Sequence, residues 1–286
     1  MEIYACNYAD DKYKSQQKLN TKTALSIGKV KKVFVYGPED LDLSFRKKHK
    51  KILSYRRGGG LWLWKPYIIL KTLETIRDDD WLFYADSGSI YVNEVSKLVN
   101  AVSTTTSSDV FCFEIPLKNR QFCKRETFER LSMYDENQNQ ILSGFILLRN
   151  STESRNFIKE WLEIMTDEIS LSPNHFTEVR EFDDFIAHRE DQSLLSLLCY
   201  KKKLMVYRDP SDYGDRPYML ARSPFIYAPR KYSNSTYPKI VISNRYHNPL
   251  KYYWREKLLT MLHFVCPSMM EKIVLRMRKV NKVEKQ

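Results

Sequence analysis

The chain has 286 residues, 43% of them hydrophobic, and a formal net charge of +12, which suits one large α/β domain with a small extension. No apolar run reaches the roughly 18 residues that a membrane-spanning helix needs, and the first residues lack the basic and apolar regions of a signal peptide. The five cysteines are odd in number and form no C-x-x-C pair, which argues against a zinc or disulfide framework and favours a reducing, cytoplasmic compartment.

The first apolar segments predict the opening β-α-β unit of a parallel sheet. Residues 3–6 are typical of a short buried strand, and a polar helical stretch follows them. Residues 32–36 predict a second strand, which the turn residue Gly37 closes.

A glycine-rich turn then leads into a helix. The glycines at 58–60 permit a tight and unusual backbone path, and Pro66 suits the first turn of a helix. Apolar residues recur at helical spacing over 66–77, which predicts an amphipathic helix there.

A carboxylate follows the most apolar strand of the chain. Residues 81–85 predict a fully buried strand, and it stops abruptly at Asp86. Open α/β sheets place their ligands at such a position, although a turn aspartate before Ser-Gly is the simpler interpretation. The acidic run at 78–80 offers a rival metal cluster, or only a solvated helix end.

The remaining elements continue the alternation of strands and helices. We expect helices at 92–102, 152–166 and 194–198, strands at 109–113, 142–148 and 239–242, and loops over 209–240. Two C-terminal helices are predicted at 249–265 and 268–280.

The C-terminal extension is basic. Residues 251–286 hold nine Lys or Arg against three Glu, which is half of the net charge. The second helix is basic and amphipathic, so we predict peripheral attachment to an anionic cytoplasmic membrane surface. The alternative is that the helices pack on the main domain and their charges are only solvated.

Five segments together resemble a known group of enzymes. Residues 84–88 (YADSG) resemble the strand-end D-x-D element of GT-A glycosyltransferases, and residues 60–66 (GLWLWKP) resemble a segment of glycosyltransferases from capsule and lipopolysaccharide (O-antigen) gene clusters. Residues 124–128 (KRETF) and 188–193 (HREDQS) are similar to two further segments of that group. Residues 143–145 (SGF) resemble the strand lining the sugar pocket in the glycogenin-like and lipopolysaccharide galactosyltransferase families.

The resemblance implies a fold, a reaction and a set of site residues. It implies a GT-A α/β domain with a mostly parallel sheet over residues 1–250, followed by the helical extension 251–286. The activity would be transfer of a sugar from a nucleotide-diphosphate sugar, with UDP-sugar as the default donor, to a glycan or lipid-linked acceptor with retention of configuration. The donor-binding residues would be Trp64, Lys65, Tyr84, Asp86, Ser87, Lys124, Ser143, Gly144, His188 and Arg189.

The catalytic and metal-binding residues follow from the same resemblance. Asp191 would contact the donor sugar and Gln192 would lie near the reacting carbon. Asp86 would hold Mn²⁺ or Mg²⁺, but Gly88 replaces the second acid of D-x-D, so the nucleotide phosphates and His247 would have to complete the coordination.

Simpler structural interpretations exist for several of these residues. Lys65 is equally compatible with a solvated helix start, and Trp62 or Trp64 with the core. Asp191 has the position of a helix cap, and His188 and Arg189 suit the pocket rim.

Three other functions remain open at this point. The charge suits a nucleic-acid-binding protein, although the sequence contains no known nucleic-acid motif and no nucleic-acid partner is expected. Gly88 suits an inactive glycosyltransferase-like scaffold. A nucleotidyltransferase is less well supported, because residues 8–12 (YADDK) replace the glycine-rich loop typical of that class.

Overall fold

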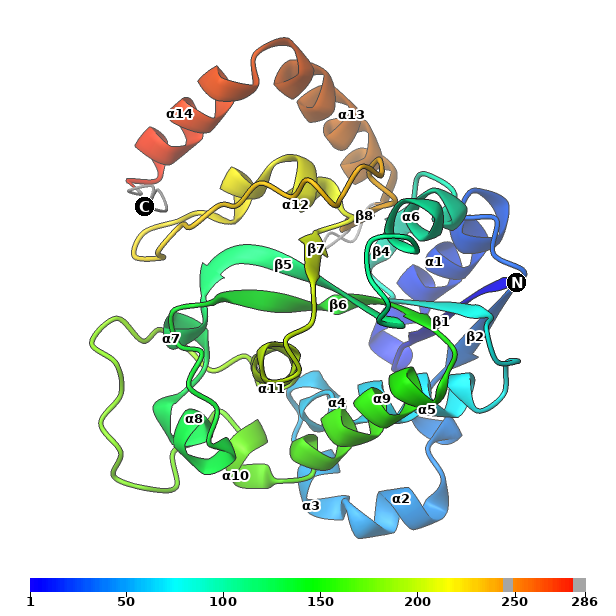
Figure 1. Ribbon diagram of the computed structural model, residues 1–286, viewed down its shortest axis with the longest axis vertical. Helices are drawn as coiled ribbons and strands as arrows, with labels where there is room; N and C mark the ends of the chain where they lie inside the picture. Colours follow the sequence, from blue (N-terminus) through cyan, green and yellow to red (C-terminus); the bar gives the residue numbers. More distant parts are fainter. Residues whose placement is uncertain (244–248, 280–286) are drawn as a thin grey trace.

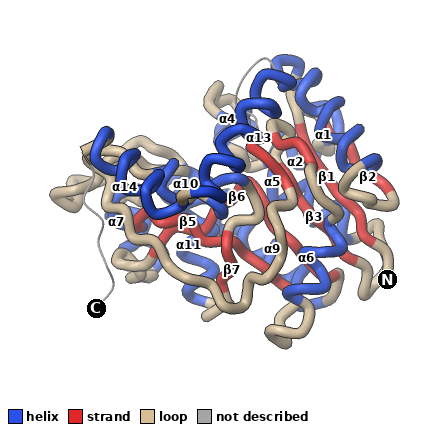
Figure 2. The backbone as a smooth tube through the Cα atoms, turned by 90° about the horizontal axis from the view of Figure 1, so that it is seen from above, coloured by secondary structure: helices blue, strands red, loops and turns tan. Residues whose placement is uncertain are grey.

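The computed structural model describes residues 1–243 and 249–279, and its centre is a six-stranded mixed sheet with helices on both faces (Figures 1 and 2). The strands follow the order β2-β1-β3-β6-β5-β7. Their bounds are β1 Ile3–Tyr8, β2 Lys32–Tyr36, β3 Trp81–Ala85, β5 Val110–Lys118, β6 Asn139–Arg149 and β7 Val206–Arg208.

The sheet is mostly parallel, as predicted. The β1–β2, β1–β3 and β5–β7 pairs are parallel, and β6 runs antiparallel to both of its neighbours, β3 and β5. The predicted α/β class is therefore confirmed.

Both faces of the sheet are covered, which explains the continuous apolar run of β3. Leu82 and Tyr84 pack on the face that carries α5 (Trp64–Leu73), α9 (Thr152–Met165) and α11 (Glu190–Lys201). Phe83 and Ala85 pack on the other face with α1 (Lys14–Ser26) and α6 (Val95–Val102). Alternate side chains of a strand point to opposite faces, so a strand between two helical layers is apolar at every position.

Several predicted boundaries were wrong, each for a local reason. The helix expected over 66–77 is α5, Trp64–Leu73, because residues 74–80 form turns that lead into β3. The helix predicted at 194–198 begins earlier, at Glu190, because its first turn is polar and a search for apolar periodicity does not detect it. The segment 209–240 contains two short helical turns, α12 (Asp212–Asp215) and η3 (Pro217–Leu220).

The strands predicted at 109–113 and 239–242 differ most from expectation, the first in extent and the second in partner. The strand at 109–113 continues to Lys118 with shifts of register along β6. The strand at 239–242 is β8 (Val241–Ser243), and it pairs with β4 (Ser89–Tyr91) in a separate two-stranded sheet, so it is not part of the main sheet. This pairing brings residue 243 close to the residues that follow Asp86.

Short helical segments connect the larger elements. They are η1 (Asp11–Tyr13), η2 (Pro38–Asp40), α2 (Leu43–Lys48), α3 (Lys50–Leu53), α4 (Gly58–Leu61), α7 (Asn119–Phe122), α8 (Arg125–Leu131) and α10 (Glu168–Leu171).

The C-terminal helices are α13 (Pro249–Val265) and α14 (Pro267–Met277), close to their predicted bounds. They lie at one end of the molecule, above α12 in Figure 1. Within the described ranges, no helix combines the length and apolarity needed to cross a membrane.

Candidate functional site

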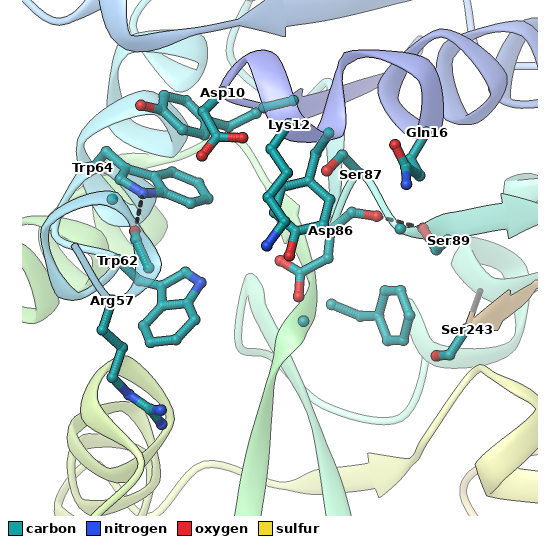
Figure 3. Close-up of a pocket in the computed structure, with 18 of the residues that line it drawn as sticks. Asp10, Lys12, Gln16, Arg57, Trp62, Trp64, Asp86, Ser87, Ser89 and Ser243 are labelled. Atoms are coloured by element: carbon teal, nitrogen blue, oxygen red, sulfur yellow. Dashed lines mark hydrogen bonds between the residues drawn. The ribbon is translucent and has the colours of Figure 1, made fainter. Parts of the chain in front are cut away.

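A cavity of about 720 Å³ opens at the carboxyl ends of β1 and β3 (Figure 3). The strand β1 lies between β2 and β3, so the connections leave it in opposite directions, and open α/β sheets bind ligands in the crevice at this switch point. The cavity is lined by Tyr8, Ala9, Asp10, Lys12, Tyr13, Gln16, Arg56, Arg57, Gly58, Gly59, Trp62, Trp64, Asp86, Ser87, Gly88, Ser89, Leu142, Gly144, Phe145 and Ser243.

Asp86 lies in the middle of the cavity wall and is held from several sides. Its backbone N–H donates to the carbonyl of Gly144 at 2.9 Å, and its Oδ1 accepts from the Tyr84 hydroxyl at 2.6 Å. A Cβ atom on Gly144 would lie 3.1 Å from Oδ2 of Asp86, so the glycine leaves room for this carboxylate. The Asp86 side chain remains 49% exposed, so it can interact with a ligand.

A buried lysine connects Asp86 to the helix α11. The Nζ of Lys65 lies 2.5 Å from Oδ2 of Asp191, 3.4 Å from Oδ1 of Asp86 and 3.2 Å from the carbonyl of Ser143. Burial alone lowers the pKa of Lys65, but the two carboxylates outweigh burial and raise this pKa above its ordinary value, so the ammonium stays charged.

Lys65 is therefore not the solvated lysine that its place near a helix start suggested. Its side chain is 2% exposed, and it does not line the cavity. It neutralises one side of the Asp86 carboxylate. Burial, followed by the charge of Asp86, raises the pKa of Tyr84 well above its ordinary value, so the hydroxyl stays protonated and donates to Asp86.

An aromatic stack forms one wall of the cavity. The rings of Tyr8 and Trp64 stack with centroids 3.8 Å apart and planes 13° apart. The indole Nε1 of Trp64 donates to the carbonyl of Gly58 at 2.8 Å, which fixes the ring (Figure 3). Trp62 lies on the same side of the cavity. Flat apolar surfaces of this kind suit a nucleotide base or a sugar ring.

The glycine-rich segment is a left-handed turn at this wall. Five consecutive residues, 58–62, have φ between 54° and 97°. The N–H of Leu61 donates to the carbonyl of Arg57 at 2.9 Å, so the turn is closed in helical fashion but with the opposite hand. A Cβ on Gly58 would lie 2.4 Å from the Trp62 ring. Leu61 and Trp62 adopt this conformation at a cost of roughly 1–2 kcal/mol each, and such strain is concentrated at functional sites.

Cations and one carboxylate complete the cavity. Arg56, Arg57 and Lys12 line it, and the Arg57 side chain is 59% exposed although its Nε donates to Glu190. Oδ1 of Asp10 is buried and has no hydrogen-bond partner among the described residues. The cavity thus offers positive charge for phosphates and an unfilled acceptor for an N–H or O–H group of a ligand.

Some predicted donor-binding residues lie outside the cavity. The Nζ of Lys124 is buried between Glu126 Oε2, at 2.9 Å, and the carbonyl of Asn174, at 2.6 Å. The backbone N–H of Lys124 donates to Nδ1 of His188 at 3.3 Å. Burial, with the charge of Lys124, lowers the pKa of His188 to about 3, so this imidazole is neutral. Both side chains join α8 and α10 to the loop before α11.

The residues around the start of α11 are also enclosed. The guanidinium of Arg189 lies over the Phe122 ring at 3.7 Å, and the side-chain amide of Gln192 donates to Gln140 at 2.6 Å. Asp191 is 5% exposed. Asp191 is also not the helix cap, because α11 starts at Glu190 with Arg189 as N-cap and no side-chain cap hydrogen bond.

The described residues do not form a metal site by themselves. Within residues 1–243 and 249–279, no three His, Cys, Asp or Glu side chains gather as metal ligands. Asp86 supplies one half-exposed carboxylate, and a divalent cation takes more oxygen ligands than this. His247, the predicted second ligand, lies outside the described residues, so the metal site stays a prediction.

Two other predicted donor-binding residues, Ser87 and Gly144, do line the cavity, whereas Ser143 lies behind it, near Lys65.

The rival acidic run at 78–80 is structural. Asp78 pairs with Arg155 at 2.6 Å and Asp79 pairs with Arg149 at 2.6 Å. Oδ1 of Asp80 accepts from the backbone N–H of residue 2.

Sequence reasoning missed the residues after β1. Tyr8 ends β1, and Asp10 and Lys12 follow it, so all three line the cavity at the carboxyl end of this strand, as Asp86 does at the end of β3. The same rule that selected Asp86 would have selected them.

No protein-family model matches the chain, and no curated protein matches its sequence. Among solved structures it is similar to the galactosyltransferase LgtC in complex with donor and acceptor sugar analogues, with 16% identity over 86% of this chain and 87% of that chain and a TM-score of 0.48. It is also similar to mouse xyloside xylosyltransferase 1 (9% identity, 87% and 99% covered, TM-score 0.47) and to the glycosyltransferase GlyE of Streptococcus pneumoniae (11% identity, 90% and 60% covered, TM-score 0.45). The chain is thus similar in structure to glycosyltransferases, at a distance.

Proposed function

We propose that the chain is a glycosyltransferase that moves a sugar from a nucleotide-diphosphate sugar to an acceptor hydroxyl. The observation that carries the proposal is the half-exposed carboxylate of Asp86, held at a sheet switch point in a cavity of about 720 Å³. The cavity also contains an aromatic stack and exposed cations, which suit the base or sugar and the diphosphate of such a donor.

Each part of the cavity has a role in this proposal. The stack of Tyr8 and Trp64 supports a flat ring of the donor. Arg56 and Arg57 neutralise the diphosphate, which gains charge as it leaves. Asp10 accepts a hydrogen bond from the ligand through its unpartnered Oδ1.

Lys65 and Asp191 act behind the cavity wall as positioning residues. Their ion pair fixes Lys65, and Lys65 with Tyr84 fixes the orientation of the Asp86 carboxylate. The direct catalytic roles implied for Asp191 and Gln192 by the resemblance remain part of the proposal, as does retention of configuration. For either residue to reach the sugar, the start of α11 would have to become exposed when the donor binds.

The donor and acceptor are narrower parts of the proposal. UDP-sugar is the default donor. The acceptor is a glycan or a lipid-linked sugar of surface polysaccharide (capsule or lipopolysaccharide) synthesis, at the cytoplasmic face of a membrane. A bound Mn²⁺ or Mg²⁺ would offset charge on the donor phosphates, with Asp86 and His247 as its protein ligands.

A panel of nucleotide sugars tests the proposal. We expect one nucleoside diphosphate and its sugar to raise the melting temperature by roughly 4–5 °C at a hundredfold excess over Kd, and Mn²⁺ to increase this shift. Binding without turnover would indicate the inactive scaffold. If no nucleotide sugar changes the melting temperature while a labelled oligonucleotide binds, the nucleic-acid alternative replaces the proposal.

A further inference from the structure

The helix α13 contacts the main domain through polar side chains. Arg216, which is 2% exposed, pairs with Glu256 and donates to Thr260 at 3.2 Å. The hydroxyl of Tyr252 donates to Oδ2 of Asp212 at 3.1 Å. The contacts made by Glu256 and Tyr252 are buried, so α13 is fixed on the segment 212–216.

The opposite face of α13 is apolar and exposed. Trp254, Leu258 and Met261 follow each other at helical spacing, and they are 65%, 54% and 61% exposed. A surface helix ordinarily buries its apolar stripe and exposes its polar one. In α13 the inner side is held mainly by polar contacts, with Tyr252 packed against Ile90 and Ile242, while the outer apolar stripe is left uncovered by the described residues. This indicates that the outer stripe has a partner of its own.

The helix α14 also presents apolar side chains to solvent. Its inner residues Met270, Val274 and Leu275 pack against an apolar cluster in the segment 218–227. Arg278, directly after the helix, donates through Nη1 to the carbonyls of residues 219 and 221 at 2.7 and 2.9 Å. Its outer residues Met269, Ile273 and Met277 are 54%, 43% and 79% exposed. Six large apolar side chains of two successive helices are therefore presented to solvent.

Cations accompany these side chains. Lys257, Lys272 and Arg276 are exposed on the two helices, and the ammonium of Lys257 lies 5.2 Å from the centre of the Trp254 ring. In the described part of α13 and α14 the acids are Glu256, which is buried against Arg216, and Glu271, which bonds Tyr227. The charge of this surface is therefore positive.

We propose that α13 and α14 lie on the surface of an anionic lipid bilayer. The bilayer contacts are the six residues Trp254, Leu258, Met261, Met269, Ile273 and Met277, which we call the outer face. Tryptophan with flexible aliphatic side chains is typical of the membrane interface, and cations beside them are attracted to anionic headgroups. A second copy of the chain is a poorer partner, because a symmetric dimer would bring two positive surfaces together.

Membrane binding would bring the active site to a lipid-linked acceptor, and only this role of the binding rests on the proposed function. The two packed helices are not a loose tail. The expectation that they pack on the main domain and the expectation that they bind a membrane are compatible, because they use opposite faces of the helices.

Vesicle co-sedimentation tests the inference with the full chain. Wild type should bind vesicles of phosphatidylcholine and phosphatidylglycerol, and binding should fall by roughly thirtyfold when Lys272 and Arg276 are replaced by Gln, because each cation near the surface contributes about 1 kcal/mol. Trp254→Gln with Met277→Gln should weaken binding by about tenfold or more, since two large apolar contacts are lost. The melting temperature of this variant should not change, because both side chains are exposed.

Two matched controls make the result decisive. Leu43 is 66% exposed on α2, so Leu43→Gln removes an apolar side chain of similar exposure elsewhere and should leave vesicle binding unchanged. The short helices α2 and α3 carry a separate basic run, and Lys47→Gln with Lys48→Gln tests it.

Equal binding by the outer-face variant and wild type, or loss of binding only in the Lys47 and Lys48 variant, would overturn the inference. A concentration-dependent dimer that the outer-face variant abolishes, without vesicle binding, would overturn it in favour of a second copy. Vesicle binding needs no nucleotide sugar, so it succeeds or fails separately from the donor site.

Discussion

Two buried cation–carboxylate clusters, one behind the cavity and one under α13, use similar chemistry for different purposes. At the cavity, Lys65 lies between Asp191 and Asp86, and at the C-terminal helices Arg216 lies between Glu256 and Asp212. Both cations are 2% exposed at their side chains, so both clusters bear the desolvation cost of buried charge.

The two clusters differ in how far their carboxylates are exposed to solvent. Asp86 is 49% exposed, whereas Glu256 and Asp212 are 6% and 4% exposed at their side chains. The second cluster is closed and fixes α13 to the main domain. The first fixes a carboxylate and leaves it accessible to a ligand. Burial of charge alone therefore does not identify a functional site, and the accessible member of the cluster does.

Removing each central cation is the strongest way to separate the two clusters. Lys65→Met and Arg216→Met each leave buried carboxylates unpaired, so each should lower the free energy of unfolding by about 3–5 kcal/mol. Only Lys65→Met should also abolish donor turnover in protein that is still folded, because it frees Asp86. Chemical denaturation combined with a turnover assay below the melting temperature measures both effects. Equal turnover in the two variants would remove the distinction.

The pH dependence of stability should come in part from the closed cluster. Burial, followed by the charge of Glu256, raises the pKa of Asp212 from 3.8 to about 6. The folded state therefore binds the proton more tightly, and this stabilisation is fully present below pH 3.8 and is lost as the pH rises through 6. Asp212→Asn removes this ionisation. Between pH 4 and pH 7 the free energy of unfolding of the variant should therefore rise by on the order of 2–3 kcal/mol relative to that of wild type. Urea titrations at several pH values test this, and a constant difference between the two proteins would contradict it.

Asp191→Asn should have a smaller effect than Lys65→Met, but it should lower both the free energy of unfolding and the turnover. Asparagine keeps the shape of the side chain and loses its charge, so Lys65 retains only Asp86 as a charged partner. We expect a loss of about 1–3 kcal/mol in the free energy of unfolding, with reduced turnover because Lys65 draws closer to Asp86. Thermal melts and turnover are measured together. Unchanged turnover in folded Asp191→Asn would mean that neither the positioning role nor sugar contact holds.

The smallest effect is expected at the acidic run. Asp78 is 73% exposed at its side chain and pairs with Arg155 on the surface. Such pairs contribute about 0–1 kcal/mol, so Asp78→Asn should leave stability and turnover nearly unchanged in the same assays. A large loss of metal-dependent turnover would move the metal site from Asp86 to this run.

The sheet and Asp86 could be predicted because they depend on local patterns. The apolar run of β3 indicates burial on both faces, and the polar residue that ends it indicates the sheet edge. The three glycines indicated an unusual backbone, and residues 58–62 do form a left-handed turn.

The rest depends on contacts between distant segments. Lys65 and Asp191 are 126 positions apart, and nothing in either segment alone indicates an ion pair. The docking of α13 depends on Arg216, which lies in a segment predicted as loop. Lys124 and His188 belong to segments that resemble donor-site motifs, yet burial directs them into the packing around α8.

Release of nucleoside diphosphate from the donor sugar identified in the panel tests the central claim most directly, in wild type and in Asp86→Asn. Asn keeps the side-chain shape at a half-exposed position, so the fold and melting temperature should be preserved. Loss of one interaction with the developing charge typically costs about 3–4 kcal/mol, or a few hundredfold in rate, and we predict a loss of this size with added Mn²⁺. Excess EDTA should also lower the activity of the wild-type protein if the cation and His247 complete the site. Full activity in Asp86→Asn would contradict the account, because the cavity would then not be the place where the donor reacts.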